Sequence, residues 1–229
     1  MRKQTKQYTG FSFVEMLLTM MILGVIMLLV ATTLNTVIKA SNTANSKNLA
    51  RSEINYIMDL YNRLLTNAEL SDIYLFESRA VREFNLAGGI PVISNTTNLG
   101  NTYLDETLTD GKIGNEIHVK LYGYSLWTCL GYFKSHDGEY GYIVKATAAN
   151  LSDHSTCFNE SSVISLLHSF SVDASDLDIN YINIGDGKNS MFVVNAELTP
   201  LYWPVSDSFP VTRAVSRQIV VSTQALTWY

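Results

Sequence analysis

The sequence predicts an α+β fold, in which one long N-terminal helix packs on a C-terminal head of antiparallel β-sheet. Two observations lead to this prediction. Residues 11–68 join an unbroken apolar run to a stretch of helical periodicity. Beyond residue 69, short segments alternate between apolar and polar side chains. We therefore expect a short basic segment over 1–10, a helix over 11–68 and a single β-rich head over 69–229.

The composition of the chain excludes several classes of protein. Of its 229 residues 47% are hydrophobic and 16% are charged, against a typical charged share of about 25%. Such a chain is neither disordered nor collagen-like. Its net charge of −5 argues against a nucleic-acid partner.

The apolar excess is concentrated between Phe11 and Val30, where Glu15 is the only charged residue. Twenty helical residues span about 30 Å, the thickness of the bilayer hydrocarbon. The basic residues Arg2, Lys3 and Lys6 precede this run and predict a cytoplasmic N-terminus. We expect one membrane span with the remainder exported. A buried core helix is the alternative, whereas a cleaved secretory signal has a shorter apolar core and a small-residue cleavage site.

Glu15 stands out because a charge is costly in a membrane. At mid-bilayer it costs about 2.5–3.5 kcal/mol on insertion scales, and less near the interface. An acid in such a segment is therefore a functional candidate. A glutamate hydrated by lipid head groups is the structural alternative.

The residues around Glu15 form a pattern: a basic leader ends in Gly10, Phe11 follows, and the acid lies five residues after the glycine. The segment Gly10-Phe-Ser-Phe-Val-Glu-Met-Leu-Leu resembles the class III signal peptide of type IV prepilins and of the pseudopilins of type II secretion. The resemblance covers residues 7–38. It implies that residues 1–10 are a leader, that prepilin peptidase cuts between Gly10 and Phe11, and that the same enzyme methylates the new N-terminus of Phe11.

The resemblance also implies a role for Glu15 in subunit docking. In the family, the corresponding acid is thought to pair with the N-terminal amine of a neighbouring subunit. Glu15 lies four residues after Phe11, on the same helix face. The expected partners are therefore prepilin peptidase, other pilins or pseudopilins, and the assembly platform. The expected location is the cytoplasmic membrane, with an extracytoplasmic head, and then a filament at the cell surface.

The chain departs from the family pattern in one respect, and the size of its head narrows the resemblance. Many major pilins carry a proline in the apolar segment, but here no proline precedes Pro91, and Gly24 is the only helix-loosening residue of the run. The head is also larger than that of a typical major subunit. The segment from Arg51 to Leu65 is similar to that of the larger minor pilins of the J-type or W-type class. The absence of the proline is compatible with minor pilins and pseudopilins.

The end of the predicted helix is amphipathic over residues 50–68. Apolar residues recur there at spacings of three, four and seven, which define one helical face that we expect to pack on the head. This face comprises Ile54, Ile57, Met58, Tyr61, Leu64, Leu65 and Ala68.

Period-two alternation predicts the strands of the head. They are expected at 73–76, 117–121, 126–133, 140–146, 177–184, 191–198 and 211–226, the last being long or interrupted. Glycine-containing turns are expected at 88–89, 110–111, 137–138 and 185–187. We expect a long exposed loop over 94–115, whereas 163–170 fits a strand or a helix equally well.

Cys129 and Cys157 both lie in the head, where export permits oxidation, so we expect a disulfide between them. Two alternatives stay open: a pair of buried free thiols, or a Cys2His2 metal site with His136 and His154, whose spacings fit no common zinc pattern. We therefore expect no metal. Acids at 173, 176, 178 and 186 lack the regular calcium-loop spacing and are expected to be solvated loop residues.

The chain carries no G-x-S-x-G, P-loop or H-E-x-x-H motif, so we expect neither an enzyme nor a cofactor. The expected function is that of a minor filament subunit, cleaved, N-methylated and assembled into a pilus or pseudopilus. The rival interpretation is a single-pass, membrane-anchored binding or sensor protein that does not polymerise.

Overall fold

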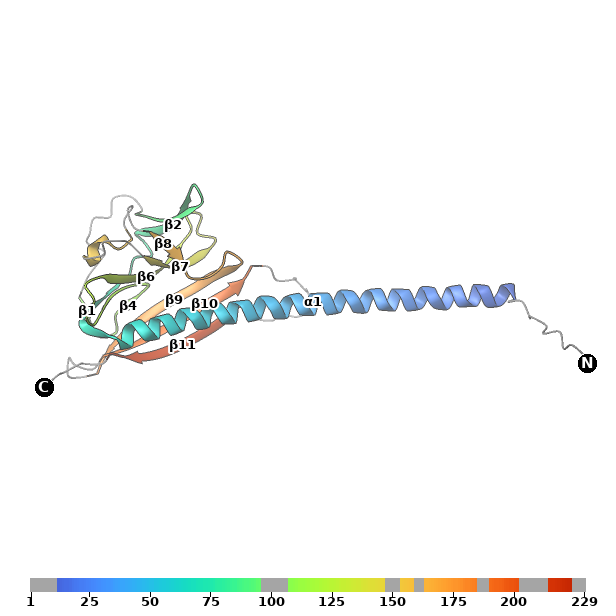
Figure 1. The fold of residues 1–229 in the computed structure, drawn as a ribbon, viewed down its shortest axis with the longest axis horizontal. Helices are drawn as coiled ribbons and strands as arrows, with labels where there is room; N and C mark the ends of the chain where they lie inside the picture. Colours follow the sequence, from blue (N-terminus) through green and yellow to red (C-terminus); the bar gives the residue numbers. More distant parts are fainter. Residues whose placement is uncertain are drawn as a thin grey trace, which may run out of the picture. The chain divides into compact units, whose positions relative to one another are not determined.

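A computed structural model describes residues 12–95, 107–146, 153–158, 163–184, 190–201 and 214–223. The fold is α+β, with one long helix and antiparallel sheets, as the sequence predicts (Figure 1). The chain divides into two compact units, one up to Asn45 and one from Ser46 onward.

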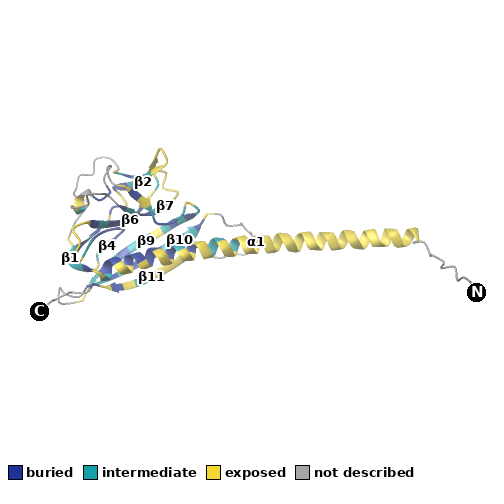
Figure 2. Cartoon of the chain, in the orientation of Figure 1, coloured by how far each residue is buried: buried dark blue, intermediate teal, exposed yellow. Residues whose placement is uncertain are grey.

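Helix α1 extends over Phe13–Thr66, 54 residues without a proline, close to the predicted bounds. Residues 12–42 are exposed throughout (Figure 2). The threonine hydroxyls in this part donate hydrogen bonds to carbonyls three or four residues earlier, so their polar groups are satisfied within the helix. These threonines are Thr19, Thr32, Thr33 and Thr36.

The part of α1 that belongs to the head buries the predicted apolar face. All seven predicted residues are buried, together with Ala50 and Leu60, although Ala68 lies in the strand that follows and not in α1. Two polar links flank this contact: Glu53 accepts a hydrogen bond from the Ser169 amide at 3.1 Å, and Arg217 donates one to the Asn55 side chain. The helical periodicity therefore identified the docking surface correctly.

Two antiparallel sheets and a hairpin form the head (Figure 1). The five-stranded sheet has the order β1 (Ala68–Phe76), β5 (Glu116–Leu121), β6 (Trp127–Lys134), β7 (Gly141–Ala146), β8 (Ile164–Leu166). The four-stranded sheet has the order β11 (Val215–Ser222), β10 (Ser190–Pro200), β9 (Val172–Asn183), β4 (Ile113–Gly114). The hairpin pairs β2 (Arg82–Ala87) with β3 (Ile90–Asn95), and the 3₁₀ turn η2 covers His154–Thr156.

The five-stranded sheet separates two hydrophobic cores, because successive side chains of a strand point to opposite faces. On β5, Ile117 and Val119 join the large core that α1 and the four-stranded sheet close. On β6, the alternate residues Cys129 and Phe133 join a smaller core beneath the β2–β3 hairpin. Glu116 and His118 alternate with the first pair on β5, and their side chains therefore lie on the side of the smaller core.

The expected loop over 94–115 is wrong at both of its ends. Its first residues continue β3, its last form β4 and the buried Asn115, and 96–106 lie outside the described residues. A Cβ added at Gly114 would lie 2.5 Å from the Phe76 carbonyl oxygen, so only glycine permits this approach.

The Asn115 side chain accepts a hydrogen bond from the Ser78 amide at 2.7 Å and donates one to the Tyr132 carbonyl at 2.6 Å. The polar composition of this segment suggested a loop, because composition does not distinguish polar groups that face solvent from polar groups that are buried and hydrogen-bonded.

Other strand bounds differ in detail. β1 begins at Ala68, directly after α1, and β9 begins five residues before the predicted start at 177. The ambiguous segment 163–170 contains the short strand β8. β2 and β3 were not predicted as strands, although the expected turn at Gly88 and Gly89 joins them with positive φ angles of 61° and 86°. The turn expected at 185–187 lies outside the described residues, as do the ends of the strand expected over 211–226.

His168 ties the segment after the short strand β8 to the neighbouring strand β7. Its Nε2 accepts a hydrogen bond from the Ile143 amide and its Nδ1 donates to the Ser169 carbonyl, both at 3.1 Å, so the ring is neutral. Burial lowers the His168 pKa from its ordinary value of 6.5, although Glu53 and Asp173 act in the opposite sense. Protonation would also abolish the bond from Ile143.

The sign of the resulting pH dependence follows from linkage. A histidine whose pKa is lowered by folding binds fewer protons in the folded state than in the unfolded state. Its contribution to the stability of the fold is therefore complete above pH 6.5 and is lost as the pH falls below that value. We expect the urea midpoint of unfolding to fall between about pH 7 and about pH 5 less steeply in His168→Gln than in the wild type. Identical slopes in the two proteins would contradict this assignment.

Candidate functional site

Two places in the chain hold the candidate functional residues: the start of α1 and the small core beneath the hairpin. Gly10 and Phe11, the predicted cleavage and methylation site, lie outside the described residues. Their roles therefore remain predictions. Glu15 is described and lies in the first turn of α1.

Glu15 takes part in a local capping arrangement that the sequence analysis missed. The Ser12 amide donates a hydrogen bond to Glu15 Oε2 at 3.0 Å, and the Val14 amide lies 3.4 Å from Ser12 Oγ. Glu15 supplies the half of a capping box that reaches back to the first amide, whereas Ser12 Oγ lies near the Val14 amide and not near that of Glu15. The S-x-x-E spacing was the signal that could have revealed it. The carboxylate remains exposed, so capping and docking are separable by substitution.

The side chains that follow Glu15 form a continuous apolar surface around α1. Large apolar residues such as Met21, at 74% exposure, and Leu28, at 67%, are exposed in the described part of the chain. Soluble monomers rarely expose apolar patches on this scale. Among the described residues, α1 is the one helix whose length and composition suit a membrane span. This surface is therefore of a length and composition that could span a membrane.

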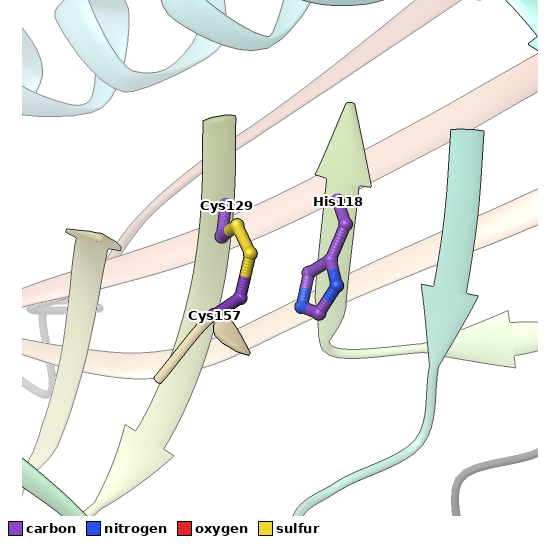
Figure 3. Close-up of side chains that lie close together, drawn as sticks. All are labelled: His118, Cys129 and Cys157. Carbon is purple, nitrogen blue, oxygen red and sulfur yellow. A yellow bond between two sulfur atoms is a disulfide. The ribbon is translucent and has the colours of Figure 1, made fainter. Parts of the chain in front are cut away.

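The predicted disulfide between Cys129 and Cys157 is present, with a Cα–Cα distance of 6.0 Å and a sequence separation of 28 (Figure 3). It joins β6 to the residue after η2, and both cysteines are buried. The two histidines weighed as metal partners of the cysteines lie in other contacts. His136 is exposed and its Nδ1 is 3.0 Å from Glu83, whereas the His154 ring stacks on Tyr74 at 4.1 Å.

The histidine that does lie beside the disulfide is His118, which the sequence analysis did not single out. Residue 118 pairs with residue 129 in the β5–β6 register. A ring nitrogen of His118 and the two sulfur atoms all lie within 4.8 Å of one another, and all three residues are buried. Only the strand register brings them together, so no sequence spacing could have revealed the cluster.

Charged groups surround His118 in the same small core. Glu116 is fully buried; Arg82 donates a hydrogen bond to its Oε1, and His118 Nε2 lies 2.7 Å from the same oxygen. Burial alone would raise the pKa of the Glu116 carboxyl, but the hydrogen bond from His118 and the charge of Arg82 outweigh it and lower that pKa. Burial also lowers the pKa of His118 more than Glu116 raises it. The carboxylate is therefore ionised beside a neutral imidazole whose Nε2–H donates to it.

The acidic residues of β9 are strand residues, not the loop residues that the sequence predicted. Asp178 accepts a hydrogen bond from Arg79, which also lies 3.7 Å from Asp176. Asp173 accepts a hydrogen bond from the Gly141 amide at 2.7 Å. These contacts give the three carboxylates structural partners, and Asp186 lies outside the described residues.

Removing the disulfide should destabilise the head by about 3–4 kcal/mol, because a closed loop of 28 residues restricts the unfolded chain. The double variant Cys129→Ala, Cys157→Ala avoids leaving a buried free thiol. The free energy of unfolding from urea titration of the full chain in detergent micelles measures the loss. An unchanged value would mean that the bridge contributes nothing to stability.

No protein-family model, curated protein or solved structure matches the chain. What the chain does must therefore be inferred from its own residues. The long apolar helix and the bridged β-rich head are the structural facts on which an assignment of function can build.

Proposed function

We propose that the chain is a minor subunit of a type IV pilus or pseudopilus, processed after Gly10 by prepilin peptidase. One observation carries the proposal: a basic leader ends in Gly10-Phe11, with a single acid, Glu15, at the start of an apolar helix that is otherwise uncharged through Ile38. The exposed apolar surface of α1 supports it, because a filament core and a bilayer both cover such a surface. The chain is then a substrate of an enzyme and not itself an enzyme.

Cleavage after Gly10 creates an α-amine on Phe11, which is a cation when protonated. In the uncut precursor that nitrogen is an uncharged peptide amide. If the Phe11 amine of one subunit pairs with the Glu15 carboxylate of a neighbouring subunit, each charge offsets the cost of removing the other from water. Cleavage would therefore permit assembly, with the platform moving subunits from the membrane into the filament.

Removal of the leader also changes the charge of the chain. Without Arg2, Lys3 and Lys6 the basic count becomes 16 − 3 = 13 against 21 acids, a side-chain net charge of −8. The basic residues that hold the N-terminus in the cytoplasm thus leave with the leader. The mature subunit keeps Glu15 as the only charge of its apolar segment up to Ile38.

We expect Gly10→Val to block processing, because a β-branched residue should not fit the peptidase site. The mature N-terminus is read by mass spectrometry of chain isolated from the native membrane. The wild type should begin with methyl-Phe11 and the variant with Met1. Gly24→Val is the matched control, since a Cβ there meets no atom within 4 Å in the described part of the chain. Cleavage of Gly10→Val with wild-type efficiency would overturn the assignment.

The alternative is a membrane-anchored binding or sensor protein that never polymerises. The hydrogen bond from the Ser12 amide to Glu15 favours it, because capping accounts for the acid without a partner subunit. An intact Met1 on wild-type chain would support this alternative. Methyl-Phe11 would exclude it.

A further inference from the structure

The four-stranded sheet packs one face on the core that α1 closes, and its other face is an outer face (Figure 1). On β10, Val194 and Ala196 are buried in the core, so the residues that alternate with them lie on the outer face. The register of β9, β10 and β11 arranges six polar residues of the outer face in two rows across the strands. The rows, which we call the acidic face, are Asp176–Glu197–Ser216 and Asp178–Asn195–Gln218.

The acidic face carries more negative charge than the described residues around it neutralise. Asp176 and Glu197 lie directly opposite one another, an arrangement in which like charges are destabilising. One guanidinium, that of Arg79, is shared among Asp176, Asp178 and Glu77. Glu197 forms no ion pair within the described residues. A cation from elsewhere would therefore relieve the repulsion on this face.

The acidic face is also hollowed. A cleft of about 260 Å³ lies over the two rows, and five of their six residues line it: Asp176, Asn195, Glu197, Ser216 and Gln218. Arg217 borders the cleft too, but its guanidinium donates a hydrogen bond to Asn55 of α1. The carboxylates and amide oxygens of the cleft are acceptors that suit the charged end of a lysine or arginine side chain.

The cations that match this face lie on α1, just before the part that packs on the head. Residues 39–52, the cationic neck, contain Lys39, Lys47 and Arg51 and no acid, a net charge of +3. Without Glu15 and the six basic residues up to Arg51, residues 53–229 hold 21 − 1 = 20 acids and 16 − 6 = 10 basic residues, a net charge of −10. Within the described residues, none of the three neck cations forms an ion pair.

We propose that the acidic face binds the cationic neck of a second copy of this chain. The face turns away from the α1 of its own chain, so Lys47 and Arg51 of the same chain do not reach it. Arg217, next to Ser216 of the first row, contacts Asn55, which sets that row level with Asn55 along α1. Arg51 and Lys47 lie about 6 and 12 Å before Asn55 along the helix. Two copies side by side therefore need an offset of about 6–12 Å along α1 to bring the opposite charges together.

The proposed contact joins two different surfaces, so each copy can bind one neighbour through its acidic face and another through its neck. Contacts of this heterologous kind build rings or open helical arrays, whereas a contact between identical surfaces stops at a dimer. The inference goes beyond the proposed function, because it needs neither cleavage after Gly10 nor the docking role of Glu15.

The test mixes unlabelled and isotope-labelled full chain in detergent micelles and joins contacting amines and carboxyls with a carbodiimide, which adds no spacer. We expect cross-links between a neck lysine and an acid of the acidic face, identified by mass spectrometry as pairs of one light and one heavy peptide. Lys120 and Asp72, 2.6 Å apart within one chain, are the internal control and should give pairs of equal label only. Formation of the control pair without mixed-label links to the acidic face would overturn the proposal.

Charge reversal separates this contact from association of the apolar helices. Glu197→Lys should raise the dissociation constant of the copies about fivefold, because an attraction becomes a repulsion. Sedimentation equilibrium in density-matched detergent measures that constant. Glu139→Lys makes the same charge change at an exposed acid outside the acidic face and should bind like the wild type. Adding Arg51→Glu to Glu197→Lys should restore binding.

Equal dissociation constants for the two lysine variants, or no recovery in the double variant, would contradict the contact. If Glu197→Lys does not fold, Arg51→Glu alone tests the same contact from the neck and should weaken binding by a similar factor. These measurements use unprocessed chain, so a failure of cleavage after Gly10 leaves them unchanged and bears only on the proposed function.

Discussion

Replacing Glu15 by alanine should nearly abolish incorporation of the chain into filaments while leaving its membrane insertion intact. In the proposed filament the substitution leaves the Phe11 amine of a neighbouring subunit desolvated and unpaired. Breaking a buried ion pair in this way costs about 3–5 kcal/mol, enough to lower incorporation more than a hundredfold. Insertion should not suffer, because the substitution removes a charge from the apolar segment.

Glu15→Gln separates the docking role of this residue from its capping role. Glutamine can still accept the hydrogen bond from the Ser12 amide, because both residues serve in a capping box. It carries no charge, so the docking role predicts that Glu15→Gln fails as Glu15→Ala does. The measurement is the ratio of chain in sheared filaments to chain in the membrane fraction. Wild-type ratios in both variants would rule out the docking role, and a defect in the alanine variant alone would assign the acid to capping.

Glu116→Gln should destabilise the head by about 3–5 kcal/mol, because it leaves the Arg82 guanidinium without its buried counter-ion. Arg82 is 8% exposed and Glu116 is fully buried, so water cannot solvate the unpaired charge. The free energy of unfolding in urea, followed by tryptophan fluorescence, measures the loss. Trp127 lies in the same small core as the disulfide and reports its unfolding.

Two further variants make this prediction specific. Glu77→Gln removes the acid of the Arg79–Glu77 pair, whose carboxylate side chain is 45% exposed, and should cost less than about 1 kcal/mol. Combining Arg82→Met with Glu116→Met should be less destabilising than Glu116→Met alone, because no buried charge is left unpaired. Equal losses in the buried and exposed acid variants would show that the Arg82–Glu116 pair is not energetically special.

How much of the fold could be predicted from the sequence depends on how far apart in the chain the interacting residues lie. The long helix and its buried face of Ile54, Ile57 and Tyr61 were predicted correctly, because helical periodicity is a local property. The central strands were correct for the same reason. Asn115 was assigned to an exposed loop because its partners, Ser78 and Tyr132, are 37 and 17 residues away. Local composition contains no information about such contacts.

By itself, the sequence determined the apolar helix with its single acid and the amphipathic docking face, and it favoured the pairing of the two cysteines that the structure contains. The helical features depend on spacing along one helix, and the cysteine pairing was expected because the sequence contains only two cysteines. Only the tertiary structure placed His118 beside the disulfide and Arg82 beside Glu116. The physical reason is that strand pairing sets which side chains meet across a sheet, and a shift of one residue would have turned His118 and Glu116 toward the opposite core.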